Sequence, residues 1–349
     1  MNKWKSYTSL IKIKGHIYDL SLSRNLDSIR SSGIDDEIIN FIELWISDID
    51  HIEQRTSGTT GEPKIIKIHK DIMVFSAKNT GKFLHLKPND RALLCLPVDF
   101  IAGKMMIVRA LVLGLDLDYQ KPVGTIKLAE KIEFCAMTPF QLLNSIENGT
   151  LNKIKKLIVG GAPVSEALLE KLQQFTTSVY ETYGMTETAS HIALKKLNGP
   201  DRTDHFMLMD GIDIKTNHES QLIITSKGLK IKNLLTNDIV RISGRDLFKW
   251  IGRKDNVINS GGIKLYPELI ESKLKSEFPN DFFIFGLLND RFGQSPAIVI
   301  EGVTDIDLEA LFKRKLEKYE IPVKVFNINN FVRTVSGKIN RNATIENLL

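Results

Sequence analysis

The chain has 349 residues, of which 42% are hydrophobic and 26% are charged. Because one folded domain usually spans roughly 100 to 200 residues, this length predicts two domains, and the ordinary composition excludes a disordered, collagen-like or coiled-coil chain. Lysine and arginine number 47 against 42 acidic residues, which gives a formal charge of +5. These basic residues are scattered along the chain, so we expect small anionic ligands and no nucleic acid.

Neither a membrane span nor a metal site built by the protein alone is expected. The most apolar stretch, residues 105–117, is interrupted by Arg109 and Asp116 and is too short to cross a bilayer. The first residues place lysines among apolar ones, unlike a secretory signal, which favours a cytoplasmic protein. Cys95 and Cys135 lie beside apolar residues and are expected to be packed thiols, and the seven histidines show no HExxH spacing.

Between residues 90 and 195, short apolar runs alternate with helical periodicity. This alternation predicts a mainly parallel sheet covered by helices, with ligands at the carboxyl ends of its strands. Ser165 is the expected N-cap of one helix. Strands are expected at residues 91–97, 134–137, 157–159 and 178–183, and helices at 103–113 and 165–175.

Beyond residue 204 the pattern changes to short alternating segments separated by Gly, Asn and Asp, which is typical of a small antiparallel β layer. A helix carrying Ile270, Leu274 and Phe278 follows, then a hairpin at 281–302 and a charged helix at 307–319. These last roughly 95 residues have the size and order of a small α+β domain. The predicted fold is therefore α/β, with a large N-terminal domain at 1–252 and a C-terminal domain at 253–349.

Residues 56–64 read TSGTTGEPK and gather hydroxyl side chains, two glycines and a lysine. Backbone amides and hydroxyls in such a loop can surround a polyphosphate, and the glycines permit close approach. It is not a Walker A loop, because Pro63 precedes Lys64 and Ile65 follows it. A generic cluster of this kind is more often a surface turn, but the full string resembles the phosphate-binding loop of the adenylate-forming superfamily, which includes acyl-CoA synthetases, peptide-synthetase adenylation domains and luciferases.

Further segments resemble motifs of that superfamily in the same order. VGGAP resembles the turn that packs against adenine, and YGMTET resembles the segment whose glutamate binds Mg²⁺. TNDIV resembles the segment whose aspartate binds the ribose, although Asn237 replaces the usual glycine; because asparagine tolerates a positive φ, we expect the turn to be kept. The hinge and the loop with the catalytic lysine are matched by residues 252–270 and 334–341.

The resemblance implies a two-step reaction: ATP with Mg²⁺ adenylates a carboxylate, and the thiol of CoA then displaces AMP after the C-terminal domain turns about a hinge. Asp255 is the expected hinge residue. The expected catalytic residues are Lys338, Glu187 and Thr186, with Glu187 also the Mg²⁺ ligand. The expected nucleotide-binding residues are Thr56, Ser57, Gly58, Thr59, Thr60, Gly61, Lys64, Gly161, Ala162, Tyr183, Asp238 and Arg253.

The segment before the phosphate-loop motif is much shorter than in most superfamily members, so we expect much of the usual N-terminal subdomain to be absent. Residues 96–111 and 183–194 resemble the o-succinylbenzoate-CoA ligases of menaquinone biosynthesis. Their substrate carries a second, unreactive carboxylate on its ring. Candidate substrate-binding residues are Phe100, Lys104, Arg109, Ser190 and His191.

Ordinary structural roles remain open for these residues, as a solvated helix face for the polar ones and as core for the phenylalanine. Two alternative functions also remain open. One is another acyl- or aryl-CoA ligase of the same superfamily. The other is a non-catalytic homologue, which the loss of Lys338, Glu187 or Lys64 would indicate, and all three are present.

Overall fold

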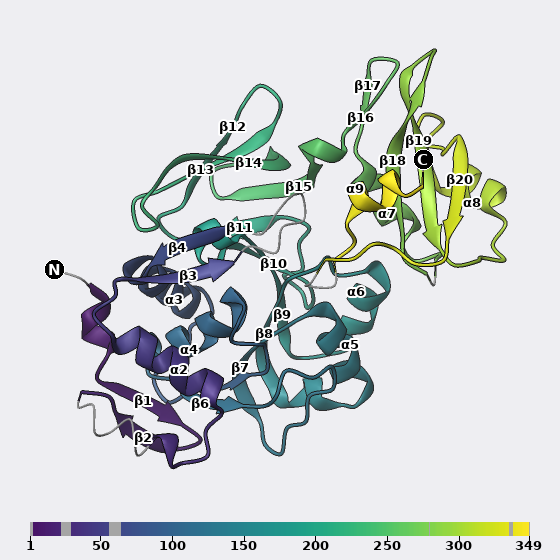
Figure 1. Ribbon diagram of the computed structural model, residues 1–349. Coiled ribbons are helices and arrows are strands. Elements are labelled where there is room, and N and C mark those ends of the chain that lie inside the picture. Colours follow the sequence, from purple (N-terminus) through teal and green to yellow (C-terminus); the bar gives the residue numbers. More distant parts are fainter. Residues whose placement is uncertain (1–2, 22–28, 56–63, 279, 335–337, 349) are drawn as a thin grey trace.

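The computed structural model describes residues 3–21, 29–55, 64–278, 280–334 and 338–348, and all structural statements refer to these. A thirteen-stranded sheet runs through the larger part of the protein, and a five-stranded sheet lies in the C-terminal part (Figure 1). A hairpin of β3 (His51–Arg55) and β4 (Ile65–His69) belongs to neither sheet.

The parallel strands of the large sheet lie side by side in the order β6-β5-β7-β8-β9. They confirm the strands expected from the sequence between residues 90 and 195. The edge beyond β6 is completed by β1 in parallel and β2 in antiparallel pairing. The bounds are β1 (Leu10–Ile13), β2 (His16–Asp19), β5 (Arg91–Leu94), β6 (Asp116–Tyr119), β7 (Ile132–Met137), β8 (Ile154–Val159) and β9 (Ser178–Gly184).

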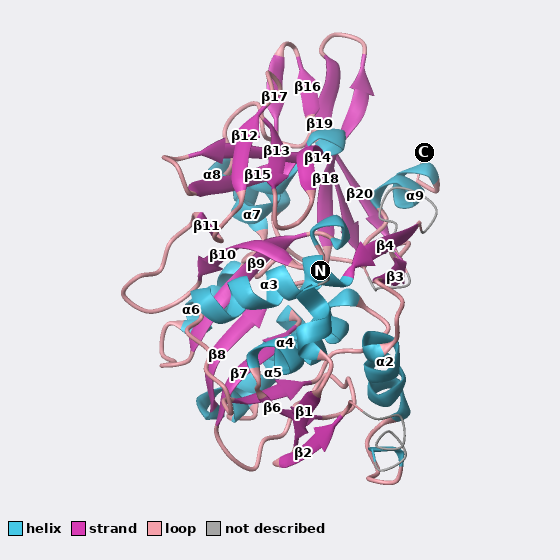
Figure 2. Ribbon diagram, turned by 90° about the vertical axis from the view of Figure 1, so that its left-hand side faces the viewer, coloured by secondary structure: helices cyan, strands magenta, loops and turns pink. Residues whose placement is uncertain are grey.

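Helices cover both faces of this sheet (Figure 2). One face packs against α2 (Asp36–Ile46), α3 (Lys70–Phe83) and α4 (Ile101–Leu113), and the other against α5 (Pro139–Glu147) and α6 (Glu166–Leu172). Short 3₁₀ turns are η1 (Lys3–Tyr7), η2 (Thr150–Lys153) and η3 (Thr186–Thr188). The predicted cap is confirmed, because the Ser165 hydroxyl accepts a hydrogen bond from the backbone N–H of Leu168 at 3.3 Å.

Side chains that alternate along a strand point to opposite faces of the sheet. On β7, Phe134 therefore packs in the core with α4, whereas Cys135 packs in the core with α5. Cys95 and Cys135 are both buried, and their sulfur atoms lie 3.7 Å apart. Both cysteines are packed thiols, as the sequence predicts.

The antiparallel strands that the sequence predicts are present, and they extend the parallel sheet edge to edge. From β9 the order continues as β10-β11-β15-β14-β13-β12. In this arrangement the last parallel strand, β9, lies where the two halves of the sheet meet. The bounds are β10 (His191–Lys196), β11 (Phe206–Leu208), β12 (Asp213–Thr216), β13 (Gln221–Ser226), β14 (Ile231–Ile242) and β15 (Leu247–Arg253).

The C-terminal part follows η4 (Lys254–Asn256) and is built on β16 (Ile258–Ser260), β17 (Ile263–Leu265), β18 (Phe282–Asn289), β19 (Gly293–Glu301) and β20 (Lys324–Ile328). Its helices are α7 (Pro267–Leu274), α8 (Leu308–Lys315) and α9 (Arg341–Glu346). The predicted helix ends at Leu274, earlier than its apolar spacing suggests, yet Phe278 still packs in the same core. Among the described residues, the apolar cores of this part share no side chain with those of the large sheet, which supports the domain boundary that we propose near residues 252–255.

None of the helices in the described ranges is both long enough and apolar enough to cross a membrane.

Candidate active site

The carboxyl ends of β8 and β9 lie next to each other, and each leads into an exposed turn. Gly161 and Ala162 follow β8, and Gly161 has a φ of +88°, a conformation that favours glycine. Thr186 and Glu187 follow β9 in η3, and the Glu187 side chain is exposed. Open α/β sheets bind ligands at this edge, so these four predicted residues lie where a nucleotide is expected.

Asp238 of β14 is the centre of a polar cluster beside β9. Only 8% of it is exposed, and its Oδ2 accepts a hydrogen bond from the Tyr183 hydroxyl at 2.7 Å. Its Oδ1 accepts one from Trp250 Nε1 at 3.1 Å and lies 3.8 Å from Arg253 Nη1. A carboxylate can accept about four hydrogen bonds, so Asp238 retains capacity for the hydroxyl groups of a sugar.

Burial, reinforced by the charge of Asp238, raises the pKa of the Tyr183 hydroxyl. Tyr183 therefore stays a hydrogen-bond donor to Asp238 at any ordinary pH. The contribution of Trp250 was not foreseen from the sequence, because a tryptophan in a β-strand gives no local sign of which carboxylate its indole N–H will reach.

Lys338 approaches the same cluster from the C-terminal part of the chain. Partial burial and the nearby guanidinium of Arg253 both lower the pKa of Lys338. Its backbone N–H donates to the Thr334 hydroxyl at 3.2 Å, and its carbonyl accepts from the Thr334 N–H at 2.8 Å. Two neighbouring cations repel each other unless an anion lies close to both, and the phosphates of a nucleotide are such an anion.

Residues 253–256 lie where the large sheet ends and the C-terminal part begins, and their side chains contact residues of both parts. Asn237 donates a hydrogen bond to the Asp255 carboxylate, and Lys254 pairs with Glu219. Asn256 donates to Glu268 at the start of α7. The role of Asp255 as a hinge stays a prediction.

The expectation for the backbone at Asn237 is wrong. Asn237 lies inside strand β14 and is not among the residues with a positive φ. A strand residue needs no left-handed conformation, so the tolerance of asparagine for positive φ is not what this position uses. What Asn237 contributes is its side chain, which reaches Asp255.

Three of the candidate substrate-binding residues, Arg109, Ser190 and His191, form one hydrogen-bonded cluster. Arg109 donates through Nη2 to the Ser190 hydroxyl at 2.8 Å and through Nε to the Thr80 hydroxyl at 3.3 Å. His191 Nδ1 lies 3.2 Å from the Ser190 hydroxyl, and His191 Nε2 lies 3.1 Å from Thr80. The sequence did not indicate a role for Thr80 of α3, because its distance from the motifs along the chain does not predict this contact.

Burial dominates the electrostatics of this cluster. Arg109 is 2% exposed, and burial lowers its pKa to about 9, which leaves it charged at neutral pH. Burial and the charge of Arg109 hold the pKa of His191 well below its usual value, so His191 is neutral. The network then runs from Arg109 through the Ser190 hydroxyl to His191 Nδ1, with His191 Nε2–H donating to Thr80.

Within the described ranges, no carboxylate pairs with the Arg109 guanidinium. It donates to Thr80, Ser190 and, weakly, the sulfur of Met106, so three of its five N–H groups have partners among the described residues and two have none there. A buried charge without a counter-ion is costly, and an anion that reaches this guanidinium removes that cost.

Lys104 lies on the same helix but outside this cluster. Its Nζ donates to Gln54 Oε1 at 2.7 Å and to the Asp99 carbonyl at 3.3 Å. Five positions along a helix turn a side chain by about 140°, so Lys104 and Arg109 point in different directions. Phe100, the residue before α4, is 42% exposed.

The phosphate-loop motif falls between the strands of the β3–β4 hairpin. Lys64 is described, is exposed and directly precedes β4, and β4 in turn lies against η3. Strand β4 therefore lies beside the 3₁₀ turn that carries Glu187. The predicted residues Thr56, Ser57, Gly58, Thr59, Thr60 and Gly61 lie outside the described residues.

Glu187 is the candidate Mg²⁺ ligand. Among the residues that the structure describes, no group of three or more His, Cys, Asp or Glu side chains could hold a metal ion. Mg²⁺ commonly binds through one or two carboxylates together with substrate phosphates. The exposed carboxylate of Glu187 fits a Mg²⁺ ion that arrives with a nucleotide.

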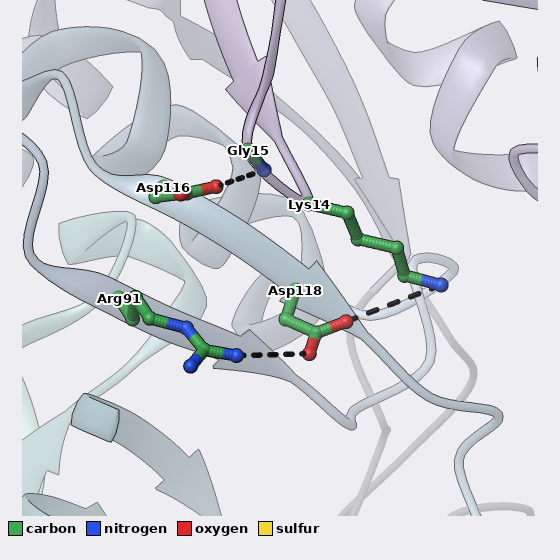
Figure 3. A pocket seen from close by; sticks show the side chains of 5 residues that line it. All are labelled: Lys14, Gly15, Arg91, Asp116 and Asp118. Carbon is green, nitrogen blue, oxygen red and sulfur yellow. Dashed lines mark hydrogen bonds and ion pairs between the residues drawn. The ribbon is translucent and has the colours of Figure 1, made fainter. Parts of the chain in front are cut away.

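A surface hollow of about 250 Å³ lies elsewhere, lined by Lys14, Gly15, Arg91, Asp116 and Asp118 (Figure 3). Arg91 and Asp116 are the first residues of β5 and β6, so this hollow lies at the amino ends of the parallel strands, away from the turns described above. Its charges are already paired, since Lys14 and Arg91 each lie 4.0 Å from Asp118.

Comparison with known proteins places this geometry in a family. Residues 54–210 match a family model described as AMP-binding enzyme. The solved structure of an acyl-CoA synthetase (AMP-forming)/AMP-acid ligase II-like protein from Dyadobacter fermentans is 35% identical, covers 90% of this chain and 94% of that chain, and superposes with a TM-score of 0.61. The chain belongs to the AMP-binding enzyme family.

Other family members carry more specific names. A 2-succinylbenzoate–CoA ligase of Listeria monocytogenes is 25% identical over 82% of this chain and 68% of its own length. The o-succinylbenzoate CoA synthetase MenE of Bacillus subtilis, solved in complex with ATP and magnesium ion, is 22% identical, with a TM-score of 0.72 over 84% of this chain and 69% of that chain. The names support an adenylate-forming ligase, and the solved structure of MenE shows the shared fold.

Proposed function

We propose that this AMP-binding enzyme is an ATP-dependent acid–thiol ligase of menaquinone biosynthesis. It adenylates o-succinylbenzoate and transfers the acyl group to CoA, which gives o-succinylbenzoyl-CoA, AMP and pyrophosphate. The family and the names of its relatives support the reaction class. The observation that carries the choice of acid is the buried guanidinium of Arg109, which has no carboxylate partner in the described part of the chain.

In the first step a carboxylate oxygen of the acid bonds to the α-phosphorus of ATP, and the bond to pyrophosphate breaks. Negative charge builds up around the phosphate, and preorganised cations stabilise it most effectively. Lys338 and Arg253 are the two cations close to each other at this place. Asp238, with Tyr183 as its donor, binds the sugar hydroxyls. Mg²⁺, when bound at Glu187, supplies further positive charge.

In the second step the sulfur of CoA bonds to the acyl carbon, and the bond to AMP breaks. This step expels AMP and needs no cation on a departing pyrophosphate. We infer that the C-terminal part, residues 253–349, turns about Asp255 between the steps and withdraws Lys338, as a hinge-controlled reaction requires.

The acid itself decides between this ligase and its relatives. A monocarboxylic aliphatic acid needs an apolar pocket only, whereas a dicarboxylic acid needs a cation for the carboxylate that does not react. Arg109 offers two unused N–H donors in a buried setting, and Ser190 and His191 hold it in place. A guanidinium suits a planar carboxylate because its donors match both oxygens.

The test is a coupled assay with ATP and CoA in which pyrophosphate release is compared for o-succinylbenzoate, benzoate and fatty acids. Release with o-succinylbenzoate at the highest kcat/KM supports the proposal. Preference for benzoate or a fatty acid would instead identify another acyl- or aryl-CoA ligase. No release with any acid would identify a non-catalytic homologue, which the presence of Lys338, Glu187 and Lys64 disfavours.

A further inference from the structure

The β3–β4 hairpin packs on the large apolar core through Ile52 and Ile68. Among the described residues, its two strands pair with each other alone and form a separate two-stranded sheet. An isolated two-stranded hairpin is marginally stable unless it packs against another element. The residue that follows β4 directly is Lys70, the first residue of α3, so its side chain is placed to supply a further anchor.

The ammonium group of Lys70 is fully buried and caps the end of α2. Its Nζ donates to the carbonyl oxygens of Leu44 and Trp45 at 2.7 Å each and of Ser47 at 3.1 Å. The last carbonyls of a helix have no partner within the helix and carry partial negative charge. Three carbonyls therefore use all three donors of the ammonium group.

Two tryptophans enclose this contact. Lys70 Nζ lies 4.1 Å from the ring centre of Trp4 and 5.9 Å from that of Trp45. Both rings are almost wholly buried, and cation–π attraction is strongest where water is excluded. The backbone N–H of Lys70 also donates to the carbonyl of Asp50, one residue before β3, at 2.8 Å. Elements η1, α2, β3 and α3 thus converge on one side chain.

The charged groups around Lys70 come from η1, β3, β4, α3 and the residues between α2 and β3. Asp48 and Asp50 favour its charged form, and Lys5 of η1 opposes it. Burial outweighs them and lowers the pKa of Lys70 to about 8. Asp71, next along α3, accepts from the backbone N–H of Trp4 at 2.9 Å, and His69 and His51 lie 3.4 Å and 3.0 Å from the Asp50 carboxylate. The Nζ group of Lys70 donates to backbone carbonyls and to none of these carboxylates.

We propose that Lys70 is a positioning residue, whose ammonium group fastens the β3–β4 hairpin to the end of α2 and so holds the two strands that flank the phosphate-loop motif against η3. The part of this inference that concerns ATP rests on the proposed function. The anchor itself does not, because it follows from contacts among described residues alone. Lys70 touches no reacting group and acts through the hairpin.

The test compares Lys70→Met and Lys70→Arg with the wild type, and uses Lys78→Met as the matched control. Lys78 is an exposed lysine on the same helix, with its Nζ 5.1 Å from the ring centre of Tyr7. Amide hydrogen exchange in β3 and β4 should be at least about tenfold faster in Lys70→Met, while β7 and β8 stay unchanged. Lys70→Arg keeps a cation with several donors and should restore much of the protection.

The kinetic measurement compares the effect of Lys70→Met on the KM for ATP with its effect on the KM for the acid. In Lys70→Met the KM for ATP should rise about tenfold, and the KM for the acid should change less, because the acid cluster lies on α3, α4 and residues 190–191 and not on the hairpin. Exchange in β3 and β4 equal to that of Lys78→Met overturns the anchor. Fast exchange with an unchanged KM for ATP overturns the positioning role.

Two further comparisons distinguish failure of the anchor from failure of the proposed function and from misfolding of the variant. If the wild type uses no ATP at all, the proposed function fails, yet the exchange comparison still decides whether Lys70 is the anchor. If Lys70→Met does not fold, the wild type is compared with Lys70→Arg across pH, after correction for intrinsic exchange. Opening of the hairpin exposes Lys70 and returns its pKa from about 8 toward the ordinary value of 10.5, so opening takes up a proton, and protection of β3 and β4 should strengthen as pH rises above about 8, in the wild type only. Equal pH profiles for the two proteins overturn the proposal.

Discussion

Arg109 and Ser190 are 81 residues apart in the chain, yet Nη2 of the first lies 2.8 Å from the hydroxyl of the second. This contact joins α4 to the segment between η3 and β10. Since Glu187 lies in η3, the same short segment carries the residue that fits Mg²⁺ and the residue that orients the buried guanidinium. Under the proposed function, the residue proposed to bind Mg²⁺ and a residue proposed to position the cation for the second carboxylate therefore lie three positions apart in the chain.

Replacement of Lys338 by alanine should separate the two half-reactions. Adenylation should slow by orders of magnitude, because the charge of Lys338 is needed while pyrophosphate departs. Thioester formation from supplied acyl-adenylate should largely survive. Both are measured with the purified variant, and Lys318→Ala, at an exposed position of the same part, serves as the control. Equal losses in the two half-reactions would contradict the assignment.

The same lysine predicts a pH dependence. Burial and Arg253 lower its pKa below the ordinary value of 10.5. The active form is protonated, so adenylation should be fully supported below this lowered pKa and should decline as pH rises through it. Lys338→Arg, which stays protonated, should lose this alkaline decline even if its rate is lower. An identical profile in the two proteins would show that another group titrates.

Asp255→Pro should give the reverse of the Lys338→Ala pattern. Proline fixes φ, which hampers rotation of the backbone at this position. Adenylation should stay mostly intact, and thioester formation should slow at least about tenfold. Asn237→Ala removes the side-chain contact to Asp255 but leaves its backbone free, so it is the control and should affect both steps little. If Asn237→Ala matches the proline variant, the contact and not the backbone rotation is responsible.

Trp250→Phe should weaken nucleotide binding. It removes one hydrogen bond to Asp238 while keeping an aromatic ring in the strand. A hydrogen bond to a charged group contributes about 1.5 to 3 kcal/mol to stability, so the free energy of unfolding should fall by about this amount. The KM for ATP should rise, because Asp238 loses a hydrogen bond that orients its carboxylate. The KM for the acid should stay near that of the wild type. An unchanged KM for ATP would remove Trp250 from the nucleotide site.

Sequence patterns predicted those strands and helix ends that depend on neighbouring residues alone. Strand β8 and the Ser165 cap follow from apolar runs and from the hydrogen bonding of a hydroxyl at a helix start. Helix α7 ends at Leu274, although apolar residues continue at helical spacing to Phe278. Phe278 packs in the same core from outside the helix, so its burial does not require the helix to continue.

The side-chain contacts within the candidate site could not be predicted from local sequence patterns. Lys104 and Arg109 stand on one helix and looked equivalent in sequence, but the direction of each side chain depends on how α4 packs. Thr80 joins the acid cluster only because α3 lies beside β10. Long-range contacts of this kind come from tertiary packing, and the sequence motifs mark only one partner of each.

We propose that Arg109 binds a second carboxylate of the acid. Removal of a cation from a buried ion pair costs about 2 to 5 kcal/mol, because the anion is left without its partner. This loss should fall on the dicarboxylate alone. Lys104→Ala is the matched control, since Lys104 lies outside the cluster and bonds to Gln54.

The decisive measurement is kcat/KM for o-succinylbenzoate and for its analogue without the ring carboxylate, in the wild type, Arg109→Ala and Lys104→Ala. Arg109→Ala should lose most of the preference between the two substrates, and Lys104→Ala should keep it, because the analogue never uses the cation. A wild-type ratio in Arg109→Ala would contradict the claim that this guanidinium binds the ring carboxylate.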